Sequence, residues 1–151
     1  MALLKLTKYI APSCVVPRLE AETKQEAIEE LLRTLQSHVA IEDLDAVRKD
    51  VFERENQMST GLTEGLAIPH AKSGGTKAMA VAVGLKPEGV EFDSLDGKPA
   101  RVVFLVVSRV DRSGPHLECL AEIAQFYSNA EARERLLRAT TAEGVINALS
   151  A

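Results

Sequence analysis

Tryptophan is absent from this chain of 151 residues, and all aromatic residues together make up 4% of it. Proteins that bind single-stranded nucleic acid stack its bases on aromatic side chains, so this kind of binding is not expected. A long basic run is absent too, and the formal net charge is −4. Because nucleic-acid affinity comes mostly from lysine and arginine contacts to phosphates, we expect no nucleic-acid partner.

Cysteine is also scarce. Cys14 and Cys119 show neither the spacing of a zinc site nor a CxxC redox pair, and their apolar neighbours predict two small buried thiols. No apolar run approaches the ~20 residues of a membrane span. Residues 1–5 are too short and too soon interrupted by charge to be a signal peptide. We therefore expect a cytoplasmic protein without direct membrane insertion.

The remaining composition is that of an ordinary globular protein. Hydrophobic residues make up 46% of the chain and charged residues 26%. A chain of this length can bury one full core, and no repeat, low-complexity segment or long linker interrupts it. The sequence predicts a single domain over residues 1–151.

Apolar residues at the helical period of 3.6 predict several helices. One ends at about residues 54–56, which places Arg54 in its last turn. Ser113 is the expected N-cap of another, because serine favours this position and Pro115 suits the first turn. Capping boxes open two of them. The helices are expected to start near Thr23, Asp43, Ser113, Ala130 and Thr140.

Two valine-rich runs, residues 79–85 and 101–107, are bounded by turn residues and predict buried strands. Between them we expect turns at 86–89 and 96–99 and a short strand at 90–92. Residues 67–69 should form a short extended piece, because a residue before proline is disfavoured in a helix. Helices on both sides of buried strands predict a layered α/β fold.

The segment from Arg54 to His70 concentrates groups with phosphate chemistry. It contains Arg54, then Ser59-Thr60-Gly61, and ends in Ile68-Pro69-His70. An imidazole nitrogen is a competent nucleophile at neutral pH because its ordinary pKa is about 6.5. The alternative for a lone Pro-His pair is a structural histidine that hydrogen-bonds a carbonyl group.

This segment resembles the active-site region of the fructose/mannitol-type IIA components of the bacterial phosphotransferase system. A second segment, His116-Leu117-x-x-Leu120-Ala121, resembles the second site motif of the same family. The resemblance covers nearly the whole chain. It implies a mixed β-sheet flanked by helices on both sides, His70 as the phosphoryl acceptor, and transfer that needs no metal or other cofactor.

Arg54 suits a phosphoryl group because its planar guanidinium binds two oxygens at once. Ser59 and Thr60 have hydroxyls, and Gly61 a backbone N–H, that would bind phosphate oxygens. The alternatives are a solvated helix charge and an ordinary polar loop, since no P-loop spacing is present. Glu55 is left out of the predicted site.

His116 lies inside the first turn of a predicted helix, where a cation is disfavoured, so its ring should be neutral. A neutral ring still donates one hydrogen bond, and the resemblance implies that it assists His70. On its own, His116 would more simply be a surface residue that caps its helix. A zinc site of His70, His116 and an acidic residue is the main chemical rival, and the charge of Arg54 argues against it.

The expected function is that of a phosphotransferase component, a phosphohistidine phosphocarrier. The donor would be the histidine phosphocarrier protein HPr or its nitrogen-branch paralogue, and the acceptor a IIB domain. Lys72 and Ser73 are expected to border the partner-binding surface. No IIB or IIC region is fused to the chain, which favours the nitrogen-regulatory branch, with regulatory target proteins, over sugar uptake.

One further alternative is a regulatory binding module that keeps the fold and carries no phosphate. It rests on Thr63, which stands where the family motif usually has its second glycine. Threonine resists positive φ.

Overall fold

The computed structural model describes residues 7–150. Its α-helices are α2 (Lys24–Leu35), α3 (Leu44–Gln57), α4 (Ser113–Ser128), α5 (Ala130–Leu137) and α6 (Ala142–Ser150), and η1 (Pro12–Cys14) is a short 3-10 helix. The strands are β1 (Val15–Val16), β2 (Leu66–Ala67), β3 (His70–Lys72), β4 (Ala80–Val90) and β5 (Ala100–Ser108). The helix after residue 43 and the two long strands lie where the sequence predicts them.

The strands form one mixed sheet in the order β1-β4-β5-β2, and β3 also pairs with β5. The central pair, β4 and β5, is antiparallel, with Ala80 opposite Val107 and Leu85 opposite Val102. The short strands β1, β2 and β3 each pair in parallel with their neighbour. The mixed sheet implied by the family resemblance is thus confirmed.

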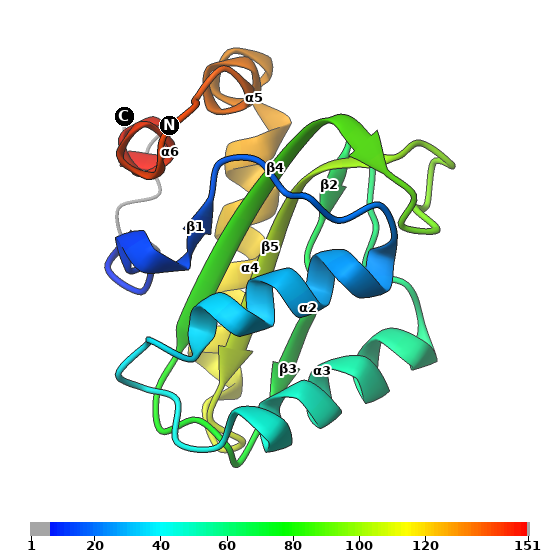
Figure 1. Cartoon of the computed structure of the whole chain (residues 1–151). Coiled ribbons are helices and arrows are strands. Elements are labelled where there is room, and N and C mark those ends of the chain that lie inside the picture. Colours follow the sequence, from blue (N-terminus) through cyan, green and yellow to red (C-terminus); the bar gives the residue numbers. More distant parts are fainter. Residues whose placement is uncertain (1–6, 151) are drawn as a thin grey trace.

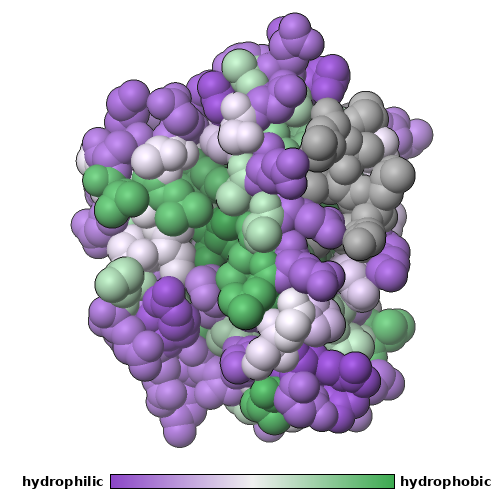
Figure 2. Space-filling view, turned by 180° about the vertical axis from the view of Figure 1, so that it is seen from behind, coloured by the Kyte–Doolittle hydropathy of each residue, from purple (hydrophilic) through white to green (hydrophobic). Residues whose placement is uncertain are grey.

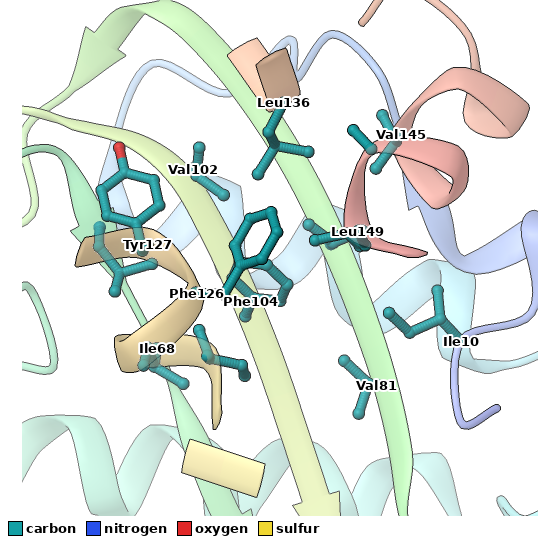
Figure 3. Packing of buried hydrophobic residues seen from close by; sticks show 14 of the residues in the cluster. Ile10, Ile68, Val81, Val102, Phe104, Phe126, Tyr127, Leu136, Val145 and Leu149 are labelled. Atoms are coloured by element: carbon teal, nitrogen blue, oxygen red, sulfur yellow. The ribbon is translucent and has the colours of Figure 1, made fainter. Parts of the chain in front are cut away.

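Helices cover both faces of this sheet (Figure 1). α2 and α3 lie on one face over a core that includes Leu32, Val51 and Leu105. α4, α5 and α6 enclose the other core, where Phe104 of β5 and Phe126 of α4 are fully buried (Figure 3). Burying alternate residues of β5 on opposite faces explains why its sequence is a continuous apolar run. Among the described residues, no helix is long and apolar enough to cross a membrane.

Side-chain caps explain where several helices begin. The Thr23 hydroxyl accepts from the Glu26 backbone N–H, and the Asp43 carboxylate accepts from that of Ala46. Each cap satisfies an N–H that has no partner within its helix. At α6 the cap is Thr141, which accepts from Gly144, one residue later than the predicted capping box at 140–143.

Three local predictions are wrong. Residues 86–89 are not a turn, and residues 90–92 do not form a separate short strand, because β4 continues to Val90 and ends there, through an irregular register between Leu85 and Val90. Gly89, with φ of 89°, absorbs the irregularity. Ser113 is also not the N-cap of α4: Arg112 holds that position, and the Ser113 hydroxyl instead accepts a hydrogen bond from Lys72.

Candidate functional site

An open groove of about 380 Å³ brings together the ends of α3, β3 and α4. Arg54 lies in the last turn of α3, His70 is the first residue of β3, and His116 lies in the first turn of α4. β3 places His70 beside Val106 of β5, and the chain then passes from the end of β5 into α4. Sheet pairing therefore carries the two histidines, 46 positions apart in the numbering, to one groove.

His70 is half-buried, and its Nδ1 lies 2.7 Å from the backbone oxygen of Ile68. A carbonyl oxygen only accepts, so Nδ1 carries the proton and Nε2 keeps the lone pair. Burial lowers the pKa of His70 below its ordinary value of 6.5, the bond to Ile68 partly opposes this, and the charge of Arg54 lowers it further. The ring is therefore neutral at pH 7, with Nε2 as its nucleophilic atom.

His116 lies beside His70, with the two ring centroids 5.4 Å apart and the ring planes tilted by 56°. It is 5% exposed, and its Nδ1 lies 2.8 Å from the Ser108 hydroxyl. Burial, followed by the charges of His70 and Lys72, lowers the pKa of His116 to about 4. The neutral ring expected from the sequence is thus present, but burial is its main cause.

The lowered pKa of His116 predicts a loss of stability in acid. The unfolded chain takes up this proton near pH 6.5 and the folded chain near pH 4, so stability is full above pH 6.5 and falls as the pH drops towards 4. The expected loss from this group is about 3 kcal/mol. Urea unfolding of the wild type and of His116→Gln, each above pH 6.5 and near pH 4, measures this loss of stability. Equal losses in the two proteins would contradict the assignment.

Two cationic side chains border the groove. Arg54 is half-exposed and donates from Nη1 to the Met58 backbone oxygen at 2.9 Å, which leaves other N–H groups of its guanidinium unpaired among residues 7–150. Lys72 donates to the Ser113 hydroxyl at 2.8 Å and so ties β3 to the start of α4. Two acidic side chains of α3 line the same groove, so these cations supply local contacts for an anion and not a net positive charge.

Ser59, Thr60 and Gly61 do not line this groove. The Ser59 hydroxyl donates to the Phe92 backbone oxygen at 2.5 Å and accepts from Gly61, while the Thr60 hydroxyl donates to Glu55 at 2.6 Å. A Cβ on Gly61 would come within 2.9 Å of the Cα of Ser94, so glycine serves a close approach of two loops. Phosphate binding by these three residues stays a prediction; the contacts described make them anchors of the loop.

Glu55 organises this loop, a role that sequence reasoning missed. It is 5% exposed and accepts from the Thr60 backbone N–H at 2.9 Å, from the Thr60 hydroxyl, and from Lys24 Nζ at 3.1 Å. A signal was present: Glu55 continues the spacing of four residues from Val47 and Val51, which form the buried side of α3. A carboxylate on that side must find partners.

Replacing Glu55 by alanine should destabilise the protein by about 3 kcal/mol, because it leaves two donors of the buried Thr60 without their acceptor and removes the nearer of the two carboxylate partners of Lys24. Glu53→Ala, on an exposed position of the same helix, is the control and should change stability by less than about 0.5 kcal/mol. Urea titration of both variants measures the difference. Equal stabilities would mean that the Glu55 contacts contribute nothing net.

Thr63 does not disturb the loop. The residues of this loop with positive φ are Glu64 at 57° and Gly65 at 88°, and Thr63 has no such strain. The backbone oxygen of Glu64 accepts from the Tyr127 hydroxyl at 2.8 Å, which anchors the second half of the loop to α4. The departure at Thr63 is therefore compatible with the observed path of the chain.

The zinc alternative lacks a ligand set within residues 7–150. No group of three His, Cys, Asp or Glu side chains there is arranged to hold a metal ion.

Comparison with known proteins identifies the family of the chain. The sequence model of the family described as phosphoenolpyruvate-dependent sugar phosphotransferase system, EIIA 2, matches residues 8–151. The fructose-specific EIIA component of Haloferax volcanii is 33% identical over 128 residues, which cover 85% of this chain and 83% of that protein. The fructose-specific EIIABC component of Bacillus subtilis is 31% identical over 97% of this chain, which spans 23% of that longer protein.

Solved structures add a regulatory relative. The nitrogen regulatory protein IIA-Ntr from Neisseria meningitidis superposes with a TM-score of 0.86 at 32% identity, over 97% of this chain and 99% of that one. The IIA mannitol protein of Escherichia coli gives a TM-score of 0.78 at 22% identity, over 93% of this chain and 98% of that one, which shows a shared fold.

Proposed function

The chain belongs to the EIIA type-2 family of the phosphoenolpyruvate-dependent sugar phosphotransferase system, a family of phosphocarriers, and we propose that its phosphoryl group is carried on Nε2 of His70. The observation that supports this most directly is the hydrogen bond from His70 Nδ1 to the Ile68 backbone oxygen. It fixes the proton on Nδ1 and turns the lone pair of Nε2 into the nucleophile.

The phosphoryl transfer needs no separate acid or base, because no proton has to be moved. Nε2 of neutral His70 attacks the phosphorus of a phosphohistidine on the donor protein, the donor N–P bond breaks, and the Nε2–P bond forms. The ring of His70 keeps its Nδ1 proton and becomes cationic, while the donor ring leaves as a neutral imidazole. The Ile68 carbonyl stabilises the cationic ring, because a hydrogen bond to a charged donor is stronger than one to a neutral donor.

Arg54 and His116 are the residues proposed to stabilise the phosphoryl group during transfer. Arg54 has unpaired guanidinium N–H groups at the groove, and His116 lies with its ring 5.4 Å from that of His70. Phosphoryl transfer depends mainly on positioning and on stabilisation of charge spread over the oxygens. Arg54 from α3 and His116 from α4 would supply a cation and a neutral donor to the groove, and these support a phosphotransferase role that needs no bound metal.

The surface around the groove suits a protein partner. Leu117 is 64% exposed and lines the groove together with Leu120 and the histidines. Seen from the side of the sheet that α4 covers, hydrophobic residues gather in the middle of a mainly hydrophilic surface (Figure 2). We propose an HPr-like phosphocarrier as donor. A IIA mannitol protein of Escherichia coli has been solved in complex with a phosphorylated IIB protein, and a IIB domain or a regulatory target is the proposed acceptor here.

We propose that the chain acts in the nitrogen-regulatory branch. The match to the Neisseria IIA-Ntr structure extends over almost the full length of both chains, and the nitrogen regulatory protein of Pseudomonas aeruginosa is 28% identical over 95% of this chain and 93% of its own length. The second candidate is sugar uptake, which the relationship to the Haloferax fructose component favours. Comparing phosphorylation rates with HPr and with its nitrogen-branch paralogue separates the two.

The phosphocarrier proposal is tested by incubating the purified protein with Enzyme I, HPr or its nitrogen-branch paralogue, and phosphoenolpyruvate, followed by intact mass measurement. We expect a gain of one phosphate that is lost in acid, because the N–P bond is acid-labile. Phosphorus–nitrogen coupling in the NMR spectrum of the labelled protein should place it on Nε2 of His70. The absence of any gain with either donor would overturn the proposal and favour the non-phosphorylated binding module.

A further inference from the structure

Ser108 is a buried residue next to the groove, and its hydroxyl contacts the ring of His116. It is the last residue of β5 and is fully buried, and its hydroxyl oxygen lies 2.8 Å from Nδ1 of His116. Its backbone oxygen accepts from the Ser73 N–H at 2.8 Å, which fixes the backbone at this point. Among residues 7–150, His116 Nδ1 is the hydrogen-bond partner of the Ser108 hydroxyl.

The direction of this bond decides what His116 presents to the groove. A neutral imidazole has one N–H and one lone pair. If Nδ1 held the proton and donated to Ser108, Nε2 would turn a lone pair towards the groove and repel phosphoryl oxygens. If the Ser108 hydroxyl donates to Nδ1, Nε2 carries the proton and becomes a hydrogen-bond donor to an anion.

The burial of Ser108 favours the arrangement in which its hydroxyl donates to Nδ1 of His116. A hydroxyl has one proton to donate, and the Ser108 hydroxyl has no acceptor within the described chain other than His116 Nδ1. With a proton on Nδ1, the buried O–H of Ser108 would have no acceptor, which is costly in an interior closed to water. With the lone pair on Nδ1, both groups are satisfied and Nε2–H is left for the groove.

We propose that Ser108 is a positioning residue that holds His116 in the Nε2–H form, so that this N–H is offered to the phosphoryl group on His70. The inference rests on the proposed function of His70 for its consequence, though the direction of the bond rests on Ser108 and His116 alone. The two histidines then have opposite forms: Nδ1–H in His70, set by a carbonyl acceptor, and Nε2–H in His116, set by a hydroxyl donor.

The direct test is a long-range proton–nitrogen correlation spectrum of the ¹⁵N-labelled protein at neutral pH, which distinguishes the two forms of each histidine. In the wild type we expect Nε2–H for His116. Ser108→Ala removes the hydrogen bond to Nδ1, so the Nδ1 resonance should move towards that of an unbonded lone pair, and Ser108→Thr, which keeps the hydroxyl and suits a strand, should restore the wild-type resonance. Ser128→Ala, which removes a hydroxyl from the far end of α4, should leave the spectrum of His116 unchanged.

The functional test is the rate at which the same variants accept phosphate from phosphorylated HPr. Ser108→Ala should slow acceptance about tenfold, the size expected for losing one hydrogen bond to a charged group. Ser108→Thr should recover most of the rate, and Ser128→Ala should match the wild type. A merely structural defect would lower the melting temperature without changing the Nδ1 resonance of His116.

A wild-type spectrum with Nδ1–H on His116, or an Nδ1 resonance that is unchanged in Ser108→Ala, would overturn the assignment. A changed Nδ1 resonance with an unchanged transfer rate would overturn the role of Ser108 in transfer. If the wild type takes up no phosphate at His70 while the Nδ1 resonance of His116 responds as expected, the proposed function fails and the Ser108 assignment stands. The spectrum and the transfer rate thus separate the two proposals.

Discussion

Replacing His70 by glutamine is expected to abolish the acid-labile gain of phosphate. Glutamine is neutral and close in size to histidine, so the local structure should persist, but an amide nitrogen has no available lone pair and does not act as a nucleophile. Intact mass after incubation with Enzyme I, HPr and phosphoenolpyruvate measures the result. We expect one phosphate on the wild type and none on His70→Gln.

His38→Gln is the matched control, because His38 is also half-buried and also contacts a backbone oxygen, that of Tyr9, yet lies outside the groove. It should take up phosphate like the wild type. Full phosphorylation of His70→Gln would show that another side chain is the acceptor and would remove the proposed mechanism. Circular dichroism of both variants shows whether each keeps its fold.

Replacing Arg54 by alanine should slow transfer by about 10²–10³-fold. Losing one preorganised donor to the charge that develops in a transition state typically costs about 2.7–4 kcal/mol. The effect on stability should be small, because the side chain is half-exposed and its described bond is a single one to the Met58 backbone oxygen. Rapid-quench measurement of transfer from phosphorylated HPr gives the rate.

Two further variants show whether the effect of Arg54 comes from the shape of its guanidinium, from its charge, or from the loss of any arginine on α3. Arg54→Lys keeps the charge but not the planar pair of donors, so it should recover only part of the rate. Arg48→Ala removes an arginine from the same helix that pairs with Glu29 and Asp45 away from the groove, and it should transfer normally. Wild-type rates in Arg54→Ala would exclude Arg54 from the mechanism.

Much of the fold could be predicted from the sequence because its signals are local. The period of apolar residues and the capping side chains at Thr23 and Asp43 depend on neighbours within one or two helical turns, and the structure has both caps. The two valine-rich runs became β4 and β5 for a similar reason. The predicted turn at 86–89 failed because pairing with β5 continued the strand past residues that favour turns.

The partners of polar side chains were not predictable in the same way. Ser59 and Thr60 have the chemistry of phosphate ligands, yet their hydroxyls bond Phe92, 33 positions later, and the buried Glu55. Glu55 itself depends on Lys24, 31 positions earlier. A hydroxyl or carboxylate binds whichever group the fold brings within reach, and sequence spacing does not contain that information.

The sequence by itself determined the fold class and the family resemblance, because these follow from local patterns of residues. It also gave the candidate chemistry of Arg54, His70 and His116, which follows from the type of each side chain. Only the tertiary structure decided which nitrogen of each histidine is free. That choice depends on one carbonyl and one buried hydroxyl, at Ile68 and Ser108, whose orientation is set by pairing of β3 with β5 and by packing of α4 over the sheet.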